Sequence, residues 1–355
     1  MQVRSPVATA VQNVFHEDLG KVAERVRAQV ATEPEYAESA VEPAEIGGRE
    51  LAHATQLARE EILTEGAVGM EKLARDPDAD LTPAEEFGVE AIVLLEGRPA
   101  LLVMNGDFAE PPAEWSVLSD SRAEIKESIA RVGRIEVAGH PNFDWVGTGF
   151  LIGPDLVMTN RHVAVEFARQ GPGGWTFVSG RSCRVDLLRE IGNPTRLEFA
   201  VTGIVGVHEA DDVDLALLRV EPTGENELPS PLRVAAVQPE DLVGRAIYVV
   251  GYPAWDGRRN EPEAMRQIFM DVYNVKRLQP GVTTAAERPV AVMRHDSSTL
   301  GGNSGSPVID LATHTVIGLH YGGRYGVGNY AVPLWELVGD PLLADADINF
   351  ADRLD

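Results

Sequence analysis

From about residue 134 to about residue 333, short runs of β-branched and other apolar residues alternate with turns rich in Gly, Pro, Asn and Asp. Runs of this length and spacing are typical of antiparallel β-barrels and β-sandwiches, whose short strands are joined by tight turns. The chain has 355 residues, enough for one large domain or two ordinary ones. We therefore expect a mainly β domain in the later part of the chain.

The first third of the chain has a helical pattern. Ser5 and Pro6 suit the start of a helix. Apolar residues then recur every three or four positions, which predicts one apolar stripe on a helix: Val11, Phe15, Leu19, Val22, Val26 and Val30. A connector with Pro and Gly over 33–48 precedes a second stripe: Leu51, Ala54, Ala58 and Ile62. The acidic segment 76–80, with its proline, ends this second pattern.

Two short features connect these regions. Apolar runs at 89–95 and 100–104 flank Glu96-Gly97-Arg98-Pro99, which predicts a strand–turn–strand hairpin near 89–104. Ser121 and Glu124 form a capping-box pair that predicts a short helix, with Ile125, Ile129 and Val132 on one side. We predict a mainly helical N-terminal module over 1–130, the β domain over 131–340 and a C-terminal tail over 341–355.

The formal charge is 31 − 55 = −24, and residues 1–120 hold 24 Asp and Glu against 9 Lys and Arg, a net of −15. An acidic surface disfavours binding to nucleic acid and to anionic membranes. No stretch approaches the 18 uninterrupted apolar residues of a membrane span. The charge supports solubility, and the alternative interpretation is that the N-terminal third docks on a basic partner.

Cys183 is the single cysteine, so no intrachain disulfide can form, which fits a reducing compartment. Polar residues from Asn13 to Asp18 interrupt the N-terminal segment before it reaches the apolar length of a signal peptide. We expect a cytoplasmic protein. No cluster of His, Cys and carboxylates has metal-ligand spacing, so we expect neither a metal nor a cofactor.

Three segments carry the residues of a candidate site. In 147–164, two apolar runs flank a Gly-Pro-Asp turn and His162 ends the second run, where a hairpin would hold a general base rigidly. In 212–220, Asp214 directly precedes an apolar strand and needs a donor partner such as an imidazole N–H. Asp211 and Asp212 are rival candidates, although both resemble solvated turn residues.

In the third segment, 296–310, glycines flank Ser304 closely. A tight turn there can aim the backbone N–H groups of Gly302 and Ser304 at one point, as an oxyanion hole requires. The segment lacks the closing glycine of the Gly-x-Ser-x-Gly elbow, because Ser306 stands in its place. The order His, Asp, Ser also differs from that of the α/β-hydrolases.

These three segments, GTGFLIGPDLVMTNRHVA, DVDLALLRV and DSSTLGGNSGSPVID, resemble the His, Asp and Ser boxes of trypsin-like peptidases. The resemblance covers about 133–335 and is nearest to the bacterial V8-like glutamyl endopeptidases, with the HtrA-like proteases further away. It implies two antiparallel six-stranded β-barrels with the active site in the cleft between them. It also implies a serine endopeptidase in which His162 is the general base, Asp214 its orienting carboxylate and Ser304 the nucleophile, with Gly302 and Ser304 as oxyanion donors.

The same resemblance suggests a substrate pocket. In glutamyl endopeptidases, a His-aromatic-Gly-Gly segment forms one wall and a Thr or Ser five residues before the nucleophile lies opposite. The matching residues are Thr299, His320, Tyr321, Gly322 and Gly323. A hydroxyl and an imidazole can both donate to a substrate carboxylate, which favours cleavage after Glu or Asp. The alternative is that His320 is structural and the pocket takes small apolar residues.

The secreted relatives complete this pocket with a freed N-terminus, whereas about 130 residues precede the first barrel strand of this chain. These residues fit a regulatory or adaptor module with its own protein partner, as in a bacterial effector protease, or a propeptide that the protease removes. A catalytically silent binding module is the alternative to an enzyme. We expect the remaining histidines of the β region to be surface or structural residues in loops: His140, His208, His295 and His314.

Overall fold

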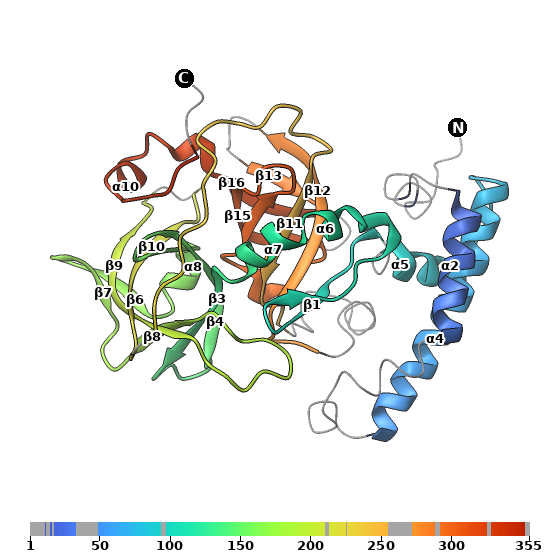
Figure 1. Ribbon diagram of the computed structural model, residues 1–355, viewed down its shortest axis with the longest axis horizontal. Helices are drawn as coiled ribbons and strands as arrows, with labels where there is room; N and C mark the ends of the chain where they lie inside the picture. The colour runs from blue at the N-terminus through green and yellow to red at the C-terminus, as the bar shows by residue number, and fades with distance from the viewer. Residues whose placement is uncertain are drawn as a thin grey trace. The chain divides into compact units, whose positions relative to one another are not determined.

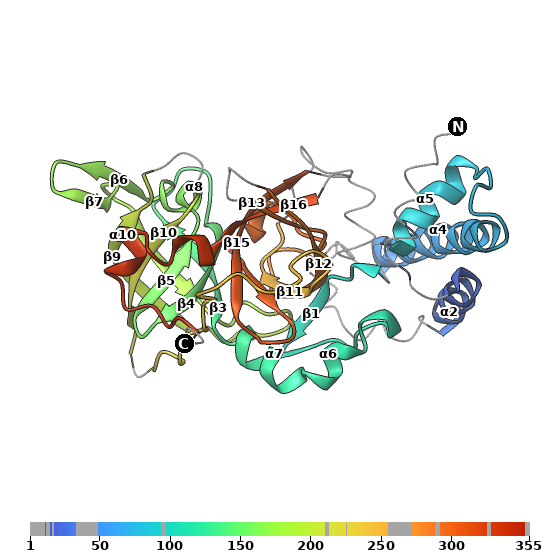
Figure 2. The same ribbon diagram turned by 90° about the horizontal axis from the view of Figure 1, so that it is seen from above.

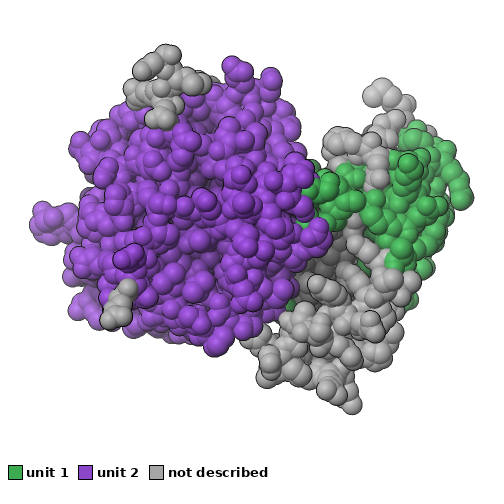
Figure 3. Space-filling view, in the orientation of Figure 1, with its two compact units in different colours: residues 1–99, 111–116, 260–272 green, residues 100–110, 117–259, 273–355 purple. Residues whose placement is uncertain are grey.

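In the computed structural model, the chain forms two compact units, which Figure 3 distinguishes by colour. The first comprises 1–99, 111–116 and 260–272, and the second comprises 100–110, 117–259 and 273–355. The residues that the structure describes are 11, 15, 18–32, 49–93, 97–209, 213–224, 226–254, 272–287, 292–324 and 328–351. The N-cap predicted at Ser5 and the connector 33–48 lie outside these residues.

The first unit is helical, as predicted. Its helices are α2 (Leu19–Thr32), α4 (Arg49–Arg75) and α5 (Pro83–Ile92). Their apolar faces form one core, which includes Val11, Phe15, Val22 and Val26 of the predicted stripe. Helix α4 ends where the acidic proline segment begins, and α4 is the longest described helix. None of the helices in the described part combines the length and hydropathy needed to cross a membrane.

The strand predicted over 89–95 is wrong, because 83–92 form helix α5. The helix starts with a capping box: the backbone N–H of Glu85 donates to Thr82 Oγ1 at 3.2 Å, and the N–H of Thr82 donates to Glu85 Oε2 at 2.9 Å. Pro83 follows at the first helical position. A short apolar run does not distinguish a strand from a buried helix, and here the cap decides.

The later half of that predicted hairpin is a strand with different partners. Strand β1 (Leu101–Met104) pairs with β2 (Asp107–Phe108) through Asn105 and Gly106, both with positive φ. β1 also pairs with a strand of the β region, with Leu101 opposite Leu278. Segment 100–110 therefore belongs to the second unit, as do α6 (Val117–Asp120) and α7 (Arg122–Ile129). The domain boundary predicted after residue 130 is wrong, because backbone pairing binds 100–110 to the β region.

The β region forms two closed, six-stranded antiparallel barrels, as predicted (Figures 1 and 2). The first contains β3 (Val132–Ala138), β4 (Trp145–Gly153), β5 (Leu156–Thr159), β8 (Ser182–Asp186), β9 (Glu198–Val207) and β10 (Ala216–Pro222), in the order β10-β5-β4-β3-β8-β9. Alternating apolar side chains such as Ile135, Val185 and Phe199 fill it. A separate hairpin joins β6 (Ala168–Gly171) to β7 (Gly174–Phe177).

The second barrel contains β11 (Ala246–Gly251), β12 (Arg277–Glu287), β13 (Val292–His295), β14 (Pro307–Asp310), β15 (Val316–Arg324) and β16 (Gly328–Pro333). The strand order is β11-β14-β15-β16-β13-β12, and the pairing of β12 with β11 closes the ring. Ile247, Val308 and Ile317 lie in its core. In Figure 1 the strands of the first barrel are green to yellow-green, and those of the second run from gold (β11) through orange to red.

The segment predicted as a C-terminal tail packs on the barrels. It contains α10 (Pro341–Ala344), which Asp340 caps. The backbone N–H of Asn349 donates to Ile152 O at 2.7 Å, and its C=O accepts from Val234 N–H at 2.8 Å. These bonds join the segment to β4 of the first barrel and to the linker between the barrels.

Candidate active site

His162 lies in the short helix α8 (Arg161–Ala164), which begins just after β5, and Asp214 lies two residues before the start of β10. Thr159 of β5 pairs with Ala216 of β10, so this register places the two residues side by side. The ring Nδ1 of His162 lies 2.5 Å from Asp214 Oδ2, and the backbone N–H of His162 donates to Asp214 Oδ1 at 3.0 Å. The two bonds fix the imidazole relative to the carboxylate.

Asp214 is held in its charged form. Burial is the largest influence and by itself raises the pKa of this carboxyl, but the hydrogen bonds and charge of His162 outweigh it and lower the pKa below its usual value. A carboxylate that accepts Nδ1–H leaves Nε2 of the ring as the proton acceptor. Asp211 and Asp212, the rival candidates, lie outside the described residues, and Asp214 is the one that meets His162.

Ser304 lies in the loop between β13 and β14, at the end of a 3₁₀ turn over Gly301–Asn303. We call residues 300–305 the serine loop. The following residue, Gly305, has φ +89°, and a Cβ there would collide with Thr148 O. The glycine of the sequence motif is therefore required by both the backbone conformation and the close approach of β4.

The serine loop lies against the first barrel beside His162. The N–H of Thr148 in β4 donates to Ser304 O at 2.8 Å. A Cβ on Gly147 would lie 2.9 Å from Ser304 O and 2.8 Å from a methyl group of Val163, the residue after His162. The structure thus brings the three predicted residues to one place. The described contacts include no hydrogen bond between the Ser304 hydroxyl and His162, and such bonds often tighten only with substrate bound.

The predicted oxyanion donors belong to this tightly packed turn. A Cβ on Gly302 would collide with Tyr252 O and with the Trp145 ring, so only glycine fits. The N–H of Ser304 donates to Gly301 O at 3.3 Å within the turn. This bond is long, and a substrate oxyanion would have to replace it for Ser304 N–H to serve as a donor.

The predicted pocket residues lie beside the serine loop. His320 of β15 is buried, its N–H donates to Ser306 O at 2.9 Å, and its C=O accepts from Gly305 N–H at 2.9 Å. Thr299 Oγ1 donates to Asn329 Oδ1 of β16 at 2.6 Å. The Tyr321 ring stacks on that of Tyr330, with centroids 6.1 Å apart. Of the two glycines, Gly322 adjoins open space and Gly323 adjoins Asn329.

The sequence analysis missed His295. It was expected in a loop, but it is the last residue of β13 and is fully buried. Its Nε2 lies 3.1 Å from His320 Nδ1. Burial lowers the pKa of His295 to about 3, and burial is also the largest cause that lowers the pKa of His320 well below its usual value. Both rings are neutral at pH 7. In a strand, His295 shares a face with the apolar Met293 two residues earlier. That spacing could have indicated that His295 is buried.

Among the residues that the structure describes, other reactive groups form no second centre. Within the described ranges, no three His, Cys, Asp or Glu side chains are grouped as a metal site would need. Cys183 is buried, which raises the pKa of its thiol far above the usual value, so it is not a thiolate nucleophile.

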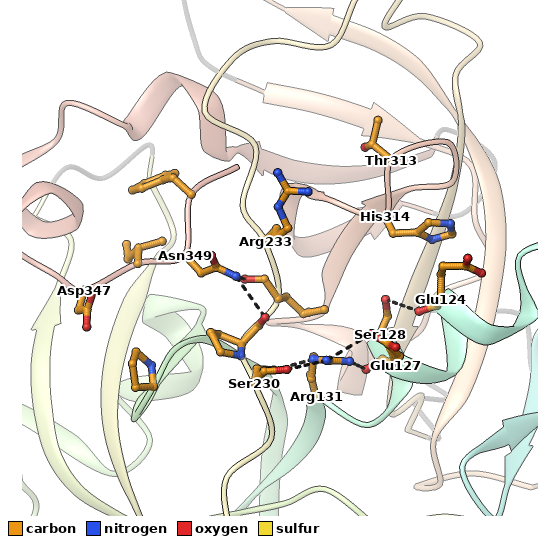
Figure 4. Close-up of a pocket in the computed structure, with 15 residues that line it drawn as sticks. Glu124, Glu127, Ser128, Arg131, Ser230, Arg233, Thr313, His314, Asp347 and Asn349 are labelled. Atoms are coloured by element: carbon orange, nitrogen blue, oxygen red, sulfur yellow. Dashed lines mark hydrogen bonds and ion pairs between the residues drawn. The ribbon is translucent and has the colours of Figure 1, made fainter. Parts of the chain in front are cut away.

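A pocket of about 770 Å³ is lined by none of the predicted site residues (Figure 4). α7, the linker before β11 and the C-terminal segment surround it, and Arg131, Arg233 and His314 are among its side chains. Arg131 is engaged within the fold, since its guanidinium donates to Ser230 O at 2.5 Å and to Ser230 Oγ at 2.7 Å. These bonds join the turn that follows α7 to the linker.

Several known proteases are similar to this chain. A family profile described as a trypsin-like peptidase domain matches residues 147–319. A probable serine protease of Lysobacter enzymogenes is 30% identical over an alignment 318 residues long, which covers 78% of this chain and 79% of that protein. A glutamyl endopeptidase of Staphylococcus epidermidis is 29% identical over 181 residues, which are 50% of this chain and 54% of that protein. A solved serine endoprotease from Yersinia pestis has a TM-score of 0.42 and 17% identity, covering 62% of this chain and 66% of that one.

Two closed, six-stranded antiparallel barrels define the chymotrypsin-like fold. The similarity to the Lysobacter protease extends over most of both chains. The chain belongs to the trypsin-like serine proteases.

Proposed function

We propose that the protein is an endopeptidase whose catalytic triad is His162, Asp214 and Ser304. The observation that carries this assignment is the pair of hydrogen bonds from His162 to the Asp214 carboxylate, next to a serine held against the same barrel. The alternative, a catalytically silent module, would be favoured by a missing triad member or a lost glycine of the serine loop. Neither is missing from the sequence.

In the proposed reaction, Ser304 Oγ attacks the carbonyl carbon of the scissile bond, and His162 Nε2 accepts the hydroxyl proton. The negative charge on the carbonyl oxygen is stabilised by the N–H groups of Gly302 and Ser304, once the latter has left Gly301 O. His162 then gives its proton to the leaving amine, and an acyl-enzyme remains on Ser304. A water molecule, deprotonated by His162, hydrolyses that ester and restores the serine.

A fluorophosphonate probe, which reacts with activated serines, tests this assignment. Wild type is expected to be labelled and Ser304→Ala is not. Ser306→Ala is the matched control, because it removes a buried hydroxyl two residues away that has no assigned role. Equal labelling of wild type and Ser304→Ala would show that another residue is the nucleophile. An unlabelled wild type would favour the silent module.

We further propose a preference for Glu or Asp before the scissile bond. Nδ1 of His295 is buried without a hydrogen-bond partner among the described groups. A buried N–H is rarely left unpaired, so we infer that His295 carries its proton on Nε2 and donates to His320 Nδ1. His320 then carries its proton on Nε2, where it can donate to a substrate carboxylate.

This tautomer provides a donor without a buried permanent charge. A panel of peptides that differ only in the residue before the scissile bond tests the preference. Faster cleavage after Glu or Asp is expected, and His295→Phe should reduce it by withdrawing the donor to His320. Preference for Leu or Ala in the wild type would support the small apolar pocket instead.

For the helical unit, we propose a regulatory or adaptor role with a protein partner, as in a bacterial effector protease of the cytoplasm. Its separate core and its acidic sequence support this role. The competing proposal is a propeptide that the protease removes at its many glutamates. Mass spectrometry of purified wild type beside Ser304→Ala distinguishes them: an intact N-terminus in both argues for a permanent module, and trimming of the wild type alone argues for a propeptide.

A further inference from the structure

Thr148 joins the two barrels at the serine loop. It lies in β4 of the first barrel and is fully buried. Its hydroxyl donates to Gly302 O at 2.8 Å, and its backbone N–H donates to Ser304 O at 2.8 Å. One residue of the first barrel therefore holds two carbonyls of the serine loop, which belongs to the second barrel.

The direction of the Thr148 hydroxyl is fixed by its other contacts. Tyr252, which follows β11, donates its backbone N–H to Thr148 Oγ1 at 3.3 Å, so the hydroxyl accepts from one side and donates to Gly302 on the other. The backbone C=O of Thr148 accepts from Thr159 Oγ1 at 2.7 Å. Every polar group of Thr148 is engaged, and a buried hydroxyl in such a network has one stable orientation.

The serine loop needs such a restraint, because three of its six residues are glycine: Gly301, Gly302 and Gly305. Glycine gives the backbone more conformational freedom than any other residue. The Gly302 C=O belongs to the 302–303 peptide and the Ser304 C=O to the 304–305 peptide, so the two bonds from Thr148 fix the peptide plane that follows each of these residues. The orientations of the Gly302 and Ser304 backbones depend on those planes.

We propose that Thr148 is a positioning residue for catalysis. Its hydroxyl holds the Gly302 backbone, and this contact keeps the serine loop in a fixed position relative to His162 and Asp214 on the first barrel. Thr148 touches neither the substrate nor the reacting atoms. The proposal rests on the triad assigned above, and it concerns a hydroxyl that the triad does not include.

Steady-state hydrolysis by Thr148→Val and Thr148→Ser tests the proposal in the full-length protein. Valine has nearly the same shape but no hydroxyl, and we expect kcat to fall by about 10- to 100-fold with KM little changed. A peptide aldehyde, whose adduct resembles the tetrahedral intermediate, should lose affinity in parallel. Serine keeps the hydroxyl and should stay within about threefold of wild type, since the 2.8 Å bond can form.

The matched control is Thr283→Val in β12, which removes another buried threonine hydroxyl bonded to backbone. It should lose thermal stability as Thr148→Val does, yet keep wild-type kcat. The proposal is overturned if Thr148→Val keeps wild-type kcat and aldehyde affinity, or if Thr148→Ser is as impaired as Thr148→Val. A wild type that fluorophosphonate does not label would instead contradict the triad, so the two failures are distinguishable.

Discussion

The Asp214 carboxylate accepts both the ring Nδ1–H and the backbone N–H of His162, at 2.5 and 3.0 Å. The carboxylate therefore fixes the position of the α8 backbone and the orientation of the ring that α8 carries. A side chain that accepts only the ring N–H would leave the helix free to shift. This double contact predicts that Asp214 acts through geometry as well as charge.

Replacement of Asp214 by Asn is expected to reduce kcat by about 10³- to 10⁴-fold, because an amide favours the wrong imidazole tautomer. Peptide hydrolysis measured near neutral pH gives the ratio. Asp155→Asn is the control, since that carboxylate forms an exposed ion pair with Arg219. If Asp214→Asn hydrolyses peptide at the wild-type rate, Asp211 or Asp212 becomes the better assignment.

The buried His295 predicts a pH dependence of stability. Its folded pKa is about 3, whereas the unfolded value is about 6.5. Between these values the unfolded chain binds a proton that the folded protein does not, so stability falls as pH decreases below about 6.5. One such group changes the free energy of unfolding by at most about 1.4 kcal/mol per pH unit.

Urea unfolding of wild type and His295→Gln at pH 7.5, 6.5 and 5.5 measures this contribution. The variant lacks the group, so its stability should decline less steeply over that range. Parallel declines in the two proteins would show that His295 is protonated in the folded state or already neutral in the unfolded chain.

The contact between α4 and α5 predicts a stability effect confined to the helical unit. A Cβ on Gly66 would collide with the backbone of Gly88. Gly66→Ala is therefore expected to cost about 1–3 kcal/mol through overpacking. Thermal unfolding measures the loss, and Glu61→Ala on the exposed face of α4 is the control. Hydrolysis of a short peptide should persist, because every assigned site residue belongs to the other unit. Unchanged stability would contradict the close packing of the two helices.

Some of these features were predictable from local sequence. The mainly β class follows from short β-branched runs between turns, whereas the two barrels were implied by the resemblance to trypsin-like peptidases. The positions of His162 and Ser304 follow from the glycines and strands around them. Those signals lie within about 18 consecutive residues in each box. Asp214 was preferred among three aspartates because it abuts an apolar strand, and its contact with His162, 52 positions away, depends on the β5–β10 register.

Other features depend on contacts that no local pattern contains. The apolar run at 89–95 is compatible with both a strand and a buried helix. The capping box of Thr82 and Glu85, which lies outside that run, distinguishes the two. His295 and His320 are 25 residues apart, and only the barrel brings their rings together. Segment 100–110 was assigned to the helical module because its partner strand, β12, lies far along the chain.

The packing around Gly302 predicts a loss of catalysis that leaves the histidine–aspartate pair intact. An added Cβ would collide with Tyr252 O and the Trp145 ring, so the peptide carrying the Gly302 N–H would have to turn away. Loss of one oxyanion donor typically costs about 10²- to 10³-fold in kcat, and Gly302→Ala should fall in that range.

Peptide hydrolysis and aldehyde inhibition of Gly302→Ala check this prediction together. Because the oxyanion forms only in the tetrahedral species, kcat and aldehyde affinity should fall in parallel while KM changes little. Gly339→Ala is the control, since a Cβ there meets nothing within 4 Å. A Gly302→Ala protein with a raised KM and an unchanged kcat would place this glycine in substrate binding rather than in the oxyanion hole.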